Sequence, residues 1–345
     1  MKIVIDTTPL TNANAMRGVG RYTGELVEAL QRVKGENDIF SSGQLAVGQK
    51  VDLVHYPFFD LFFPTLPLRR SARTVVTVHD VIPLLFPAHY PVGVRGRLAF
   101  WRQKLALSTV SKIITDSVVS RRDIHTHLGV PLEKIVAVPL AASPDFFKPA
   151  REFCIDVKRK YELPKIFILY VGDINYNKNL PFLLRVTAKI PKLHLVMVGK
   201  QMKNTSIPEG RTIQNAIATL AISDRVKLLT DVENGDLPAI YALSTATIIP
   251  SLYEGFGLPA LEAMQCKTVV ISSCGGSLPE VVGDGGLMFN PHDDDECEQK
   301  IREVLKFSPE MRNALIRKGT AQAAKFSWEA TAKQTLVVYQ SCLQN

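Results

Sequence analysis

The sequence predicts an α/β protein built from two doubly wound, Rossmann-like parallel sheets. The chain has 345 residues, enough for two domains that each bury a core. Short apolar runs alternate with helical patterns in both halves, as in parallel βαβ units. Between the halves, residues 138–149 contain three prolines, which mark a linker. We therefore expect domains over 1–150 and 151–327, followed by a helix over 328–345.

The first half begins with a strand at Met1–Asp6 and continues with a helix from Gly20 to Val33. Further apolar runs predict strands at Val51–His55, Thr74–His79 and Lys112–Asp116. The alternation of strand and helix indicates a parallel sheet.

The second half restarts with a strong strand at Ile166–Gly172. The final stretch, Phe326–Leu343, has a serine cap and the apolar spacing of a long helix. Two doubly wound sheets bind ligands at the carboxyl ends of their strands, so we expect the domains to face one cleft. The other strands expected here are His194–Gly199, Val226–Leu229, Thr245–Ile249 and Thr268–Ser272.

The charge is concentrated in the first half of the chain. Residues 1–150 carry 18 Lys/Arg against 12 Asp/Glu, or +6, and the other 195 carry 23 against 21, or +2. A basic half favours an anionic partner: a pyrophosphate-bearing substrate, an anionic lipid surface or nucleic acid. No RNP sequence, zinc finger or arginine-rich arm occurs, so we expect no nucleic-acid partner.

The composition predicts a cytoplasmic protein. The start of the sequence lacks the pattern of a secretory signal, and no apolar run reaches the ~18 residues that span a bilayer. The five cysteines are scattered and include no C-x-x-C pair. We expect free thiols and no zinc site.

The segment Ser251–Met264 carries the most specific signal. It follows the apolar run Ala246–Pro250, turns at Gly255 and Gly257, and restarts as a helix with Pro259 in its first turn. A strand, a glycine turn and a helix start present backbone N–H groups and a helix dipole to an anion or a hydroxyl.

Two carboxylates eight positions apart flank this turn. Glu254 lies on the loop, and we place Glu262 in the first turn of the helix, so that they reach opposite ends of one ligand. Carboxylates accept hydrogen bonds from hydroxyls while backbone amides bind phosphates. This combination suits a nucleotide sugar; the alternative is a surface turn whose glutamates are merely solvated.

Two loops in the first half could add contacts to a ligand. Gly18 and Gly20 follow the first strand and open a helix, so their amides could approach a phosphate, although a tight turn explains them equally well. His79 and Asp80 end a strand. They could bind a sugar hydroxyl or move a proton, or they could simply cap a turn.

In the second half, Lys178 and Asn179 stand between a strand and a helix, where a lysine would present its charge to a diphosphate. The alternative is a solvated loop lysine. The acidic run His292–Glu296 resembles an Asp-x-Asp metal site, but it follows Asn-Pro and begins a helix, so we expect an acidic N-terminal turn and no metal.

A helix over Val94–Leu105 is predicted to be basic and amphipathic, which suits an anionic membrane surface. The alternative is a helix whose apolar face packs on the core. The stripe consists of Val94, Leu98, Trp101 and Leu105, flanked by Arg95, Arg97, Arg102 and Lys104.

Glu254 and Glu262, with Gly-Phe-Gly between them, closely resemble the EX7E motif of retaining glycosyltransferases of family 4, which have the GT-B fold. The Gly18–Gly20 loop, the His-Asp-x-Ile-Pro stretch at His79 and the Lys-Asn pair at Lys178 also resemble segments of that family. The chain differs in having Asp173 and Asn177 where many relatives carry arginine.

The resemblance implies a role for each motif residue. Glu254 would bind hydroxyls of the donor sugar and Glu262 the ribose, with His79 as a further sugar contact. Lys178 and the Gly18–Gly20 loop would stabilise the departing phosphate, without a nucleophile supplied by the enzyme. Further donor contacts would be Asn179 and the backbone amides of Gly255, Phe256, Gly257 and Leu258. On the acceptor side we place Asp80 and, from the basic helix, Arg95, Trp101 and Arg102.

The resemblance also implies the reaction: transfer of a sugar from a nucleotide-diphosphate donor to an acceptor hydroxyl, with retention and without metal or cofactor. The motifs look most like mannosyl- or rhamnosyltransferases of bacterial surface polysaccharide and lipopolysaccharide assembly. We expect GDP-mannose as the donor. We expect the acceptor to be a glycan, linked to a lipid at the inner face of the plasma membrane. The alternatives are a GT-B nucleotide-sugar epimerase and a catalytically idle nucleotide-sugar-binding subunit.

Overall fold

The computed structural model describes residues 1–12, 18–35, 39–43 and 50–344. The chain forms two compact units. Unit 1 consists of residues 1–141 and 326–345, and unit 2 consists of residues 142–325. The chain therefore enters unit 2 within the proline-containing linker, before the boundary predicted after residue 150.

Unit 1 contains a six-stranded, fully parallel sheet in the order β2-β1-β3-β4-β5-β6. The four predicted strands of this half are present, each within about two residues of its predicted bounds, and β2 and β6 were not predicted. The strands are β1 (Lys2–Ile5), β2 (Ile39–Ser42), β3 (Leu53–Tyr56), β4 (Arg73–Thr77), β5 (Lys112–Thr115) and β6 (Ile135–Ala137).

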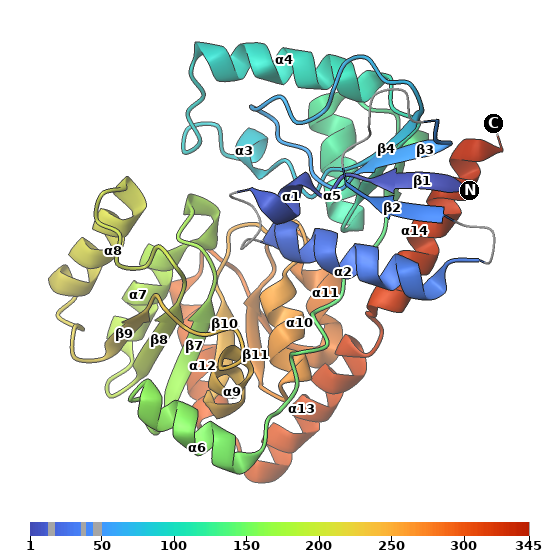
Figure 1. The fold of residues 1–345 in the computed structure, drawn as a ribbon. Helices are drawn as coiled ribbons and strands as arrows, with labels where there is room; N and C mark the ends of the chain where they lie inside the picture. Colours follow the sequence, from blue (N-terminus) through green and yellow to red (C-terminus); the bar gives the residue numbers. More distant parts are fainter. Residues whose placement is uncertain (13–17, 36–38, 44–49, 345) are drawn as a thin grey trace. The chain divides into compact units, whose positions relative to one another are not determined.

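Helices cover both faces of this sheet. Figure 1 shows α4 above strands β1–β4 and α2 below them. The helices are α1 (Thr8–Thr11), α2 (Gly18–Val33), α3 (Ile82–Leu85), α4 (Val94–Ser108), α5 (Val118–Asp123), the π-helix η1 (Ile124–Leu128), the 3-10 helix η2 (Leu132–Lys134) and α14 (Trp328–Leu343).

Helix α14 packs against α2 as part of unit 1. Its N-terminus is capped by Ser327, whose Oγ accepts from the Ala330 amide at 3.1 Å, as the serine predicted. The Thr331 hydroxyl donates to the Pro139 carbonyl at 2.7 Å. Residues that are far apart in sequence therefore share one core.

A chain of buried polar groups joins α14 to the sheet. The Tyr339 hydroxyl lies 2.6 Å from His55 Nδ1, and His55 Nε2 lies 2.8 Å from Thr77 Oγ1, which lies 2.9 Å from the Tyr22 hydroxyl. Burial, with His79 nearby, lowers the pKa of His55 to about 3. The neutral ring can then donate through one nitrogen and accept through the other.

Unit 2 has a second six-stranded parallel sheet, in the order β12-β11-β10-β7-β8-β9. All five predicted strands are present, and β12 was not predicted. The strands are β7 (Phe167–Val171), β8 (His194–Val198), β9 (Val226–Leu229), β10 (Ala246–Ile249), β11 (Val270–Ser273) and β12 (Gly286–Phe289).

The helices of unit 2 confirm the predicted starts. Pro259 lies in the first turn of α10, and the acidic run begins α12, where Asp293 Oδ1 accepts from the amides of Asp295 and Glu296. The helices are α6 (Arg151–Lys160), η3 (Tyr176–Lys178, 3-10), α7 (Leu180–Lys189), α8 (Pro208–Thr219), α9 (Leu237–Leu243), α10 (Leu258–Gln265), α11 (Leu278–Val282), η4 (Gly283–Gly285, 3-10), α12 (Asp294–Leu305) and α13 (Pro309–Ala323).

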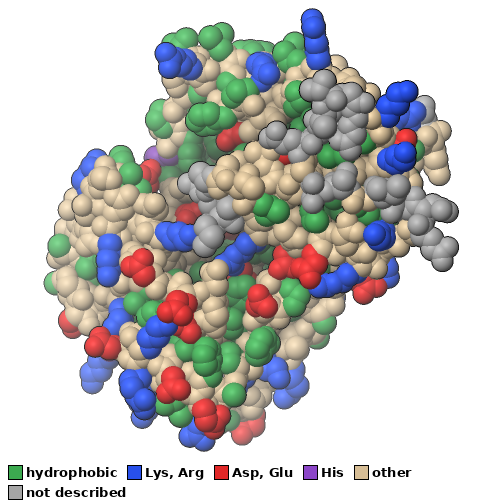
Figure 2. Space-filling view, in the orientation of Figure 1, with side chains coloured by type: hydrophobic (Ala, Val, Ile, Leu, Met, Phe, Trp, Pro, Cys, Tyr) green, Lys and Arg blue, Asp and Glu red, His purple; other side chains and the backbone are tan. Residues whose placement is uncertain are grey.

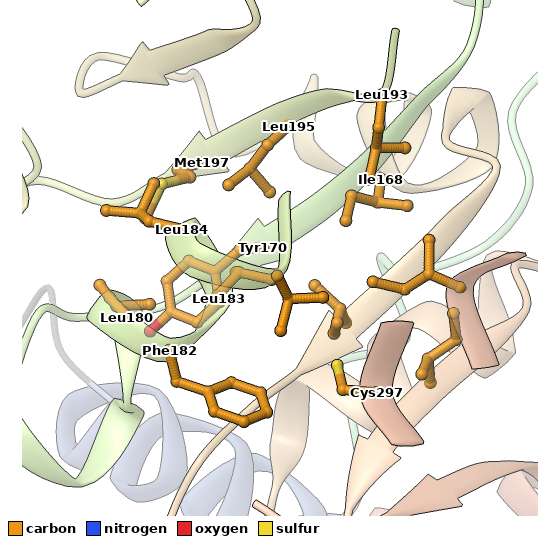
Figure 3. Packing of buried hydrophobic residues seen from close by; sticks show 14 of the residues in the cluster. Ile168, Tyr170, Leu180, Phe182, Leu183, Leu184, Leu193, Leu195, Met197 and Cys297 are labelled. Carbon is orange, nitrogen blue, oxygen red and sulfur yellow. The ribbon is translucent and has the colours of Figure 1, made fainter. Parts of the chain in front are cut away.

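The core of unit 2 lies between its sheet and α7 with α12. Figure 3 shows side chains of β7 and β8, such as Ile168 and Met197, packed with Leu183 and Phe182 of α7 and Cys297 of α12. The rings of Phe182 and Phe289 stack with centroids 5.9 Å apart. This packing holds β7 and the start of α7 in place.

Two glycines allow close backbone packing around the loop after β10. A Cβ on Gly276, which has a φ of +63°, would lie 2.4 Å from the Glu254 carbonyl oxygen. Gly257 has a φ of +107°, and a Cβ there would lie 2.8 Å from Leu278. Both positions therefore require glycine.

All five cysteines are free, as predicted, and only Cys274 is exposed. Among the described residues, no helix has the length and apolar character needed to cross a membrane.

Gly276→Ala should lower the free energy of unfolding by at least about 2 kcal/mol, because the added methyl group meets backbone atoms at a positive φ. Urea unfolding of the purified protein measures this. Gly235→Ala is the matched control: a Cβ there has nothing within 4 Å, so the change should stay within about 0.5 kcal/mol. Equal stability of the two variants would contradict the packing argument.

Candidate functional site

Unit 2 places its predicted residues where the strand order of its sheet reverses. The chain runs outward from β7 to β9 and then returns to form β10 on the other side of β7. Crevices at such reversal points are the usual ligand sites of open parallel sheets. The loop after β7 carries Lys178 and the loop after β10 carries Glu254, and the structure brings these two side chains together.

Glu254 is a buried carboxylate, only 8% exposed. Lys178 Nζ lies 2.8 Å from both of its oxygens, and the Ser251 hydroxyl donates to Oε1 at 2.5 Å. An ionised carboxylate offers about four acceptor positions. The three hydrogen bonds leave Oε2 able to accept one more, for example from a ligand hydroxyl.

Asn177 fixes the geometry of this pair. Its side-chain amide donates to the Tyr253 carbonyl at 2.9 Å, and its own carbonyl accepts from the Leu252 amide at 2.7 Å. The residue that departs from the family pattern thus binds the loop of Lys178 to the loop of Glu254. On the other side, Ser277 Oγ lies 3.0 Å from the Glu254 carbonyl and 2.8 Å from the Phe256 carbonyl, so its one hydrogen can serve either of them.

Asn179 has a structural role in this arrangement. It adopts a left-handed backbone conformation with a φ of +57° just before α7. Its amide donates to the carbonyls of Pro250 and Pro291, at 3.2 Å and 2.9 Å. The amide predicted to contact the donor is therefore engaged with the backbone of the following loops.

The turn Gly255–Leu258 forms the start of α10, as predicted. The amides of Gly257 and Leu258 make no hydrogen bond to any described residue, so they are available to an anion. Glu262 lies in the second turn of α10, so its predicted place in the first turn was wrong by one turn. Its Oε2 accepts from the Tyr241 hydroxyl at 2.7 Å.

The structure confirms that the acidic run 292–296 forms a helix start. Asp294 pairs with Arg185 and Lys189, while Asp293 caps α12. Within the part of the chain that the structure describes, no three His, Cys, Asp or Glu side chains gather as metal ligands would.

In unit 1, the predicted glycine loop opens a helix. Gly18 is the first residue of α2, and Gly20 is buried in its first turn. Asp80 Oδ1 accepts from the Ile82 amide at 2.9 Å, so this carboxylate stabilises the start of α3.

His79 pairs with a carboxylate that the sequence analysis did not single out. His79 Nδ1 lies 2.8 Å from Asp116 Oδ2, and the Tyr22 ring meets the His79 ring edge-on at 4.7 Å. Asp116 Oδ1 and His79 Nε2 are both buried from solvent. The Pro57 carbonyl also lies close enough to the His79 ring to affect its protonation.

The environment of His79 favours its protonated form. Burial alone would lower the pKa of His79, but the Asp116 carboxylate, assisted by Asp80 and the Pro57 carbonyl, raises it above its usual value. A protonated ring donates through both nitrogens.

The amphipathic stripe of α4 faces solvent, so the alternative in which it packs on the core is wrong. Val94 is 75% exposed and Trp101 is 66% exposed, with Leu98 and Leu105 similarly open. The helix instead buries Gln103, Ala106 and Leu107. Figure 2 shows hydrophobic and basic side chains together over α4, at the top of the view.

Sequence comparison assigns both halves of the chain to glycosyltransferase families. Residues 155–322 match the family model of glycosyl transferases group 1, and residues 38–146 match that of glycosyltransferase family 4. The O-antigen chain mannosyltransferase B of Escherichia coli is 32% identical over 273 residues, which cover 78% of this chain and 71% of that protein. The serotype-specific mannosyltransferase WbdA of Escherichia coli is 30% identical over 79% of this chain, which spans only 34% of WbdA.

Solved structures share the fold at low sequence identity. One of them is HepE of Anabaena in complex with UDP-glucose, with a TM-score of 0.76 at 14% sequence identity. The match covers 99% of this chain and 100% of the HepE chain. WaaG, a glycosyltransferase involved in lipopolysaccharide biosynthesis, gives a TM-score of 0.70 at 13% identity, covering 98% and 99%. The predicted GT-B fold is confirmed.

Asp116→Asn should lower the pKa of His79, because the carboxylate that most opposes the effect of burial is then removed. A raised folded-state pKa contributes stability at low pH that is lost as pH rises through that pKa. The wild type should therefore exceed Asp116→Asn in unfolding free energy by more at pH 6 than at pH 8. NMR titration of the imidazole signals and urea unfolding at both pH values measure this.

Asp145→Asn, which removes an exposed carboxylate, is the control and should leave the His79 titration unchanged. A His79 pKa that is the same in Asp116→Asn as in the wild type would show that the pair does not set the protonation of the ring.

Proposed function

Because the chain belongs to the group 1 and family 4 glycosyltransferases, we propose that it transfers mannose from GDP-mannose to a hydroxyl of a growing surface polysaccharide, with retention of configuration. The observation that carries this proposal is the cluster of Lys178, Glu254 and Ser251 at the strand reversal of unit 2. The choice of sugar rests on the relatives named as mannosyltransferases, including the O-antigen chain mannosyltransferase B.

The donor sugar binds at Glu254 in this proposal. Oε2 accepts from a sugar hydroxyl at the position that the protein leaves open, while Ser251 keeps the carboxylate oriented. A hydrogen bond to an ionised group is stronger than one between neutral groups, and this one is shielded from water by burial. Glu262, held by Tyr241, binds the ribose hydroxyls.

The diphosphate leaves with its charge stabilised by the protein. Lys178 shifts part of its interaction from Glu254 to a phosphate oxygen, and the free amides of Gly257 and Leu258 donate from the start of α10. These groups supply positive potential without a metal ion. The acceptor hydroxyl attacks the anomeric carbon on the face from which the phosphate departs, and the departing phosphate oxygen takes the hydroxyl proton. Attack on that face retains the anomeric configuration.

His79 contributes the second polar contact to the sugar in this proposal. Asp116 holds the ring through Nδ1 and favours its protonated form, so that the ring presents positive charge toward the sugar. Asp80 stabilises the start of α3, and it affects the site only because its charge helps to raise the pKa of His79.

The acceptor side lies on unit 1, and we propose that α4 docks on an anionic membrane to reach a lipid-linked glycan. Arg95, Arg102 and their neighbours supply charge, and the exposed Trp101 and Leu98 supply the apolar contact. Each Lys or Arg near an anionic leaflet contributes about 1 kcal/mol, so the four cations of α4 can localise the protein reversibly.

Glu254→Ala and Glu254→Gln should each lower transfer by at least ~100-fold, because the lost carboxylate hydrogen bonds serve the transition state. The assay follows labelled mannose from GDP-mannose onto a mannan oligosaccharide in excess EDTA, since the proposed reaction needs no metal. Glu254→Gln keeps the size of the side chain, so it remains informative if the alanine variant unfolds.

Glu303→Ala removes an exposed carboxylate of α12 and should transfer at the wild-type rate. Near-native transfer by Glu254→Gln would contradict the site. Consumption of GDP-mannose without any acceptor would instead support an epimerase or hydrolase, and binding without turnover an idle subunit.

Membrane docking should depend on charge and salt. The wild type should sediment with vesicles that contain anionic lipid, and less with neutral vesicles, because screening shortens the reach of the cations on α4. Arg95→Glu/Arg102→Glu should reduce binding at least tenfold. Co-sedimentation at low and high salt measures both effects.

The matched control is Arg317→Glu/Lys318→Glu, which makes the same change of charge on exposed residues of α13 in unit 2. It should bind vesicles within twofold of the wild type. Equal sedimentation with neutral and anionic vesicles would reject docking through α4.

A further inference from the structure

Unit 1 contains an apolar pocket of about 290 Å³ between the segment around α3 and one side of α4. This volume corresponds to roughly ten water molecules. Four aromatic rings contribute to its wall: Phe62, Tyr90, Phe100 and Trp101. Phe100 lies edge-on to Trp101 with the ring centroids 6.0 Å apart, and Phe62 and Phe100 are 6.1 Å apart. None of these residues belongs to the donor contacts described above.

The wall chemistry suits a hydrocarbon better than a sugar. Pro83 and Pro87 lack an amide hydrogen, and among the described residues that line the wall Arg97 alone is charged. A sugar ring needs several converging hydrogen-bond partners, because each hydroxyl that loses water without replacement costs binding energy. An alkyl or isoprenoid chain needs none and gains by leaving water.

The surroundings of the pocket are strongly cationic. Residues 81–115 contain five Lys/Arg and no Asp/Glu. Within the described part of the chain, Arg95, Arg97, Arg102 and Lys104 form no salt bridge, and Lys104 Nζ lies 5.8 Å from the centre of the Trp101 ring. A hydrocarbon that binds here is therefore favoured if it carries an anionic group.

The pocket also adjoins the exposed apolar stripe of α4. Trp101 belongs to both, since it lines the pocket and is 66% exposed, and Leu98 precedes it by one helical turn on the same face. A chain that leaves the bilayer at this stripe can reach the pocket along the Trp101 ring, which the two share. Its anionic head would then meet the arginines of α4.

We propose that this pocket holds the hydrocarbon chain, next to the phosphate, of the lipid that carries the growing acceptor glycan. The inference rests on the proposed transfer to a lipid-linked glycan and adds a binding site for the lipid itself. The stripe contacts the membrane as a whole, whereas the pocket accepts one chain. The protein thus recognises its acceptor partly through the carrier, and the phosphate distinguishes that carrier from an uncharged lipid.

The first test measures binding without any reaction. Trp101 and Trp328 are the two tryptophans, so in Trp328→Phe the fluorescence reports on Trp101 alone. Farnesyl phosphate, added below its aggregation concentration, should shift the emission to the blue as the chain covers the indole. Inorganic phosphate should cause no shift. The absence of a shift with farnesyl phosphate would overturn the proposal.

Val92→Phe, made in the same background, fills the pocket from a loop residue of its wall. It should weaken farnesyl phosphate binding at least tenfold. Val337→Phe is the matched control, because Val337 is 63% exposed on α14 of the same unit. It should bind within twofold of the parent, and equal weakening by both variants would count against the pocket.

The second test separates the carrier from the glycan. Val92→Phe should lower kcat/KM for the lipid-linked glycan at least tenfold more than for the same glycan without lipid. Equal losses of kcat/KM on both acceptors would overturn the proposal. An equally large loss of vesicle binding by Val92→Phe would also overturn it, because the pocket would then bind bulk phospholipid. If the wild type uses neither acceptor, the proposed function fails while the fluorescence test still decides whether the pocket binds the chain.

Discussion

The need to compensate a buried carboxylate organises the site in unit 2. Glu254 loses its water on folding, and a charge in that position is tolerated only when it is paired and hydrogen-bonded. Lys178 and Ser251 meet this need. Asn177 in turn ties the two loops together, and Gly276 lets a third loop press against them. The same charges that stabilise the loop are therefore the ones available to a ligand.

The sequence predicted every inner strand of the two described sheets, but of their four edge strands it predicted only β9. The three strands that it missed, β2, β6 and β12, all lie at an edge of their sheet. An edge strand is short and has a neighbour on one side only, so it lacks the continuous apolar run that marks a strand buried on both faces. β6, for example, has only three residues.

The site was predictable where the signal was local, as in the run from Glu254 to Glu262. Asp116 was missed because its partner His79 is 37 residues away, and only the pairing of β4 with β5 brings them together. The sequence did contain one usable signal for this pair: His79 and Asp116 are both polar residues that follow buried strands. Ser251 and Tyr241 have ordinary surroundings in sequence, and their roles follow from tertiary packing alone. The one-turn error at Glu262 arose because helix boundaries depend on caps.

Unit 1 is discontinuous, since residues 142–325 form unit 2 between its two segments. During synthesis, His55 and Thr77 leave the ribosome long before Tyr339, which completes their buried polar chain. Unit 2, by contrast, is continuous and can close its core as soon as residue 325 has emerged. The assembly of unit 1 is therefore the later event, although most of unit 1 is translated first. Nascent unit 1 therefore exposes an incomplete core throughout translation of unit 2.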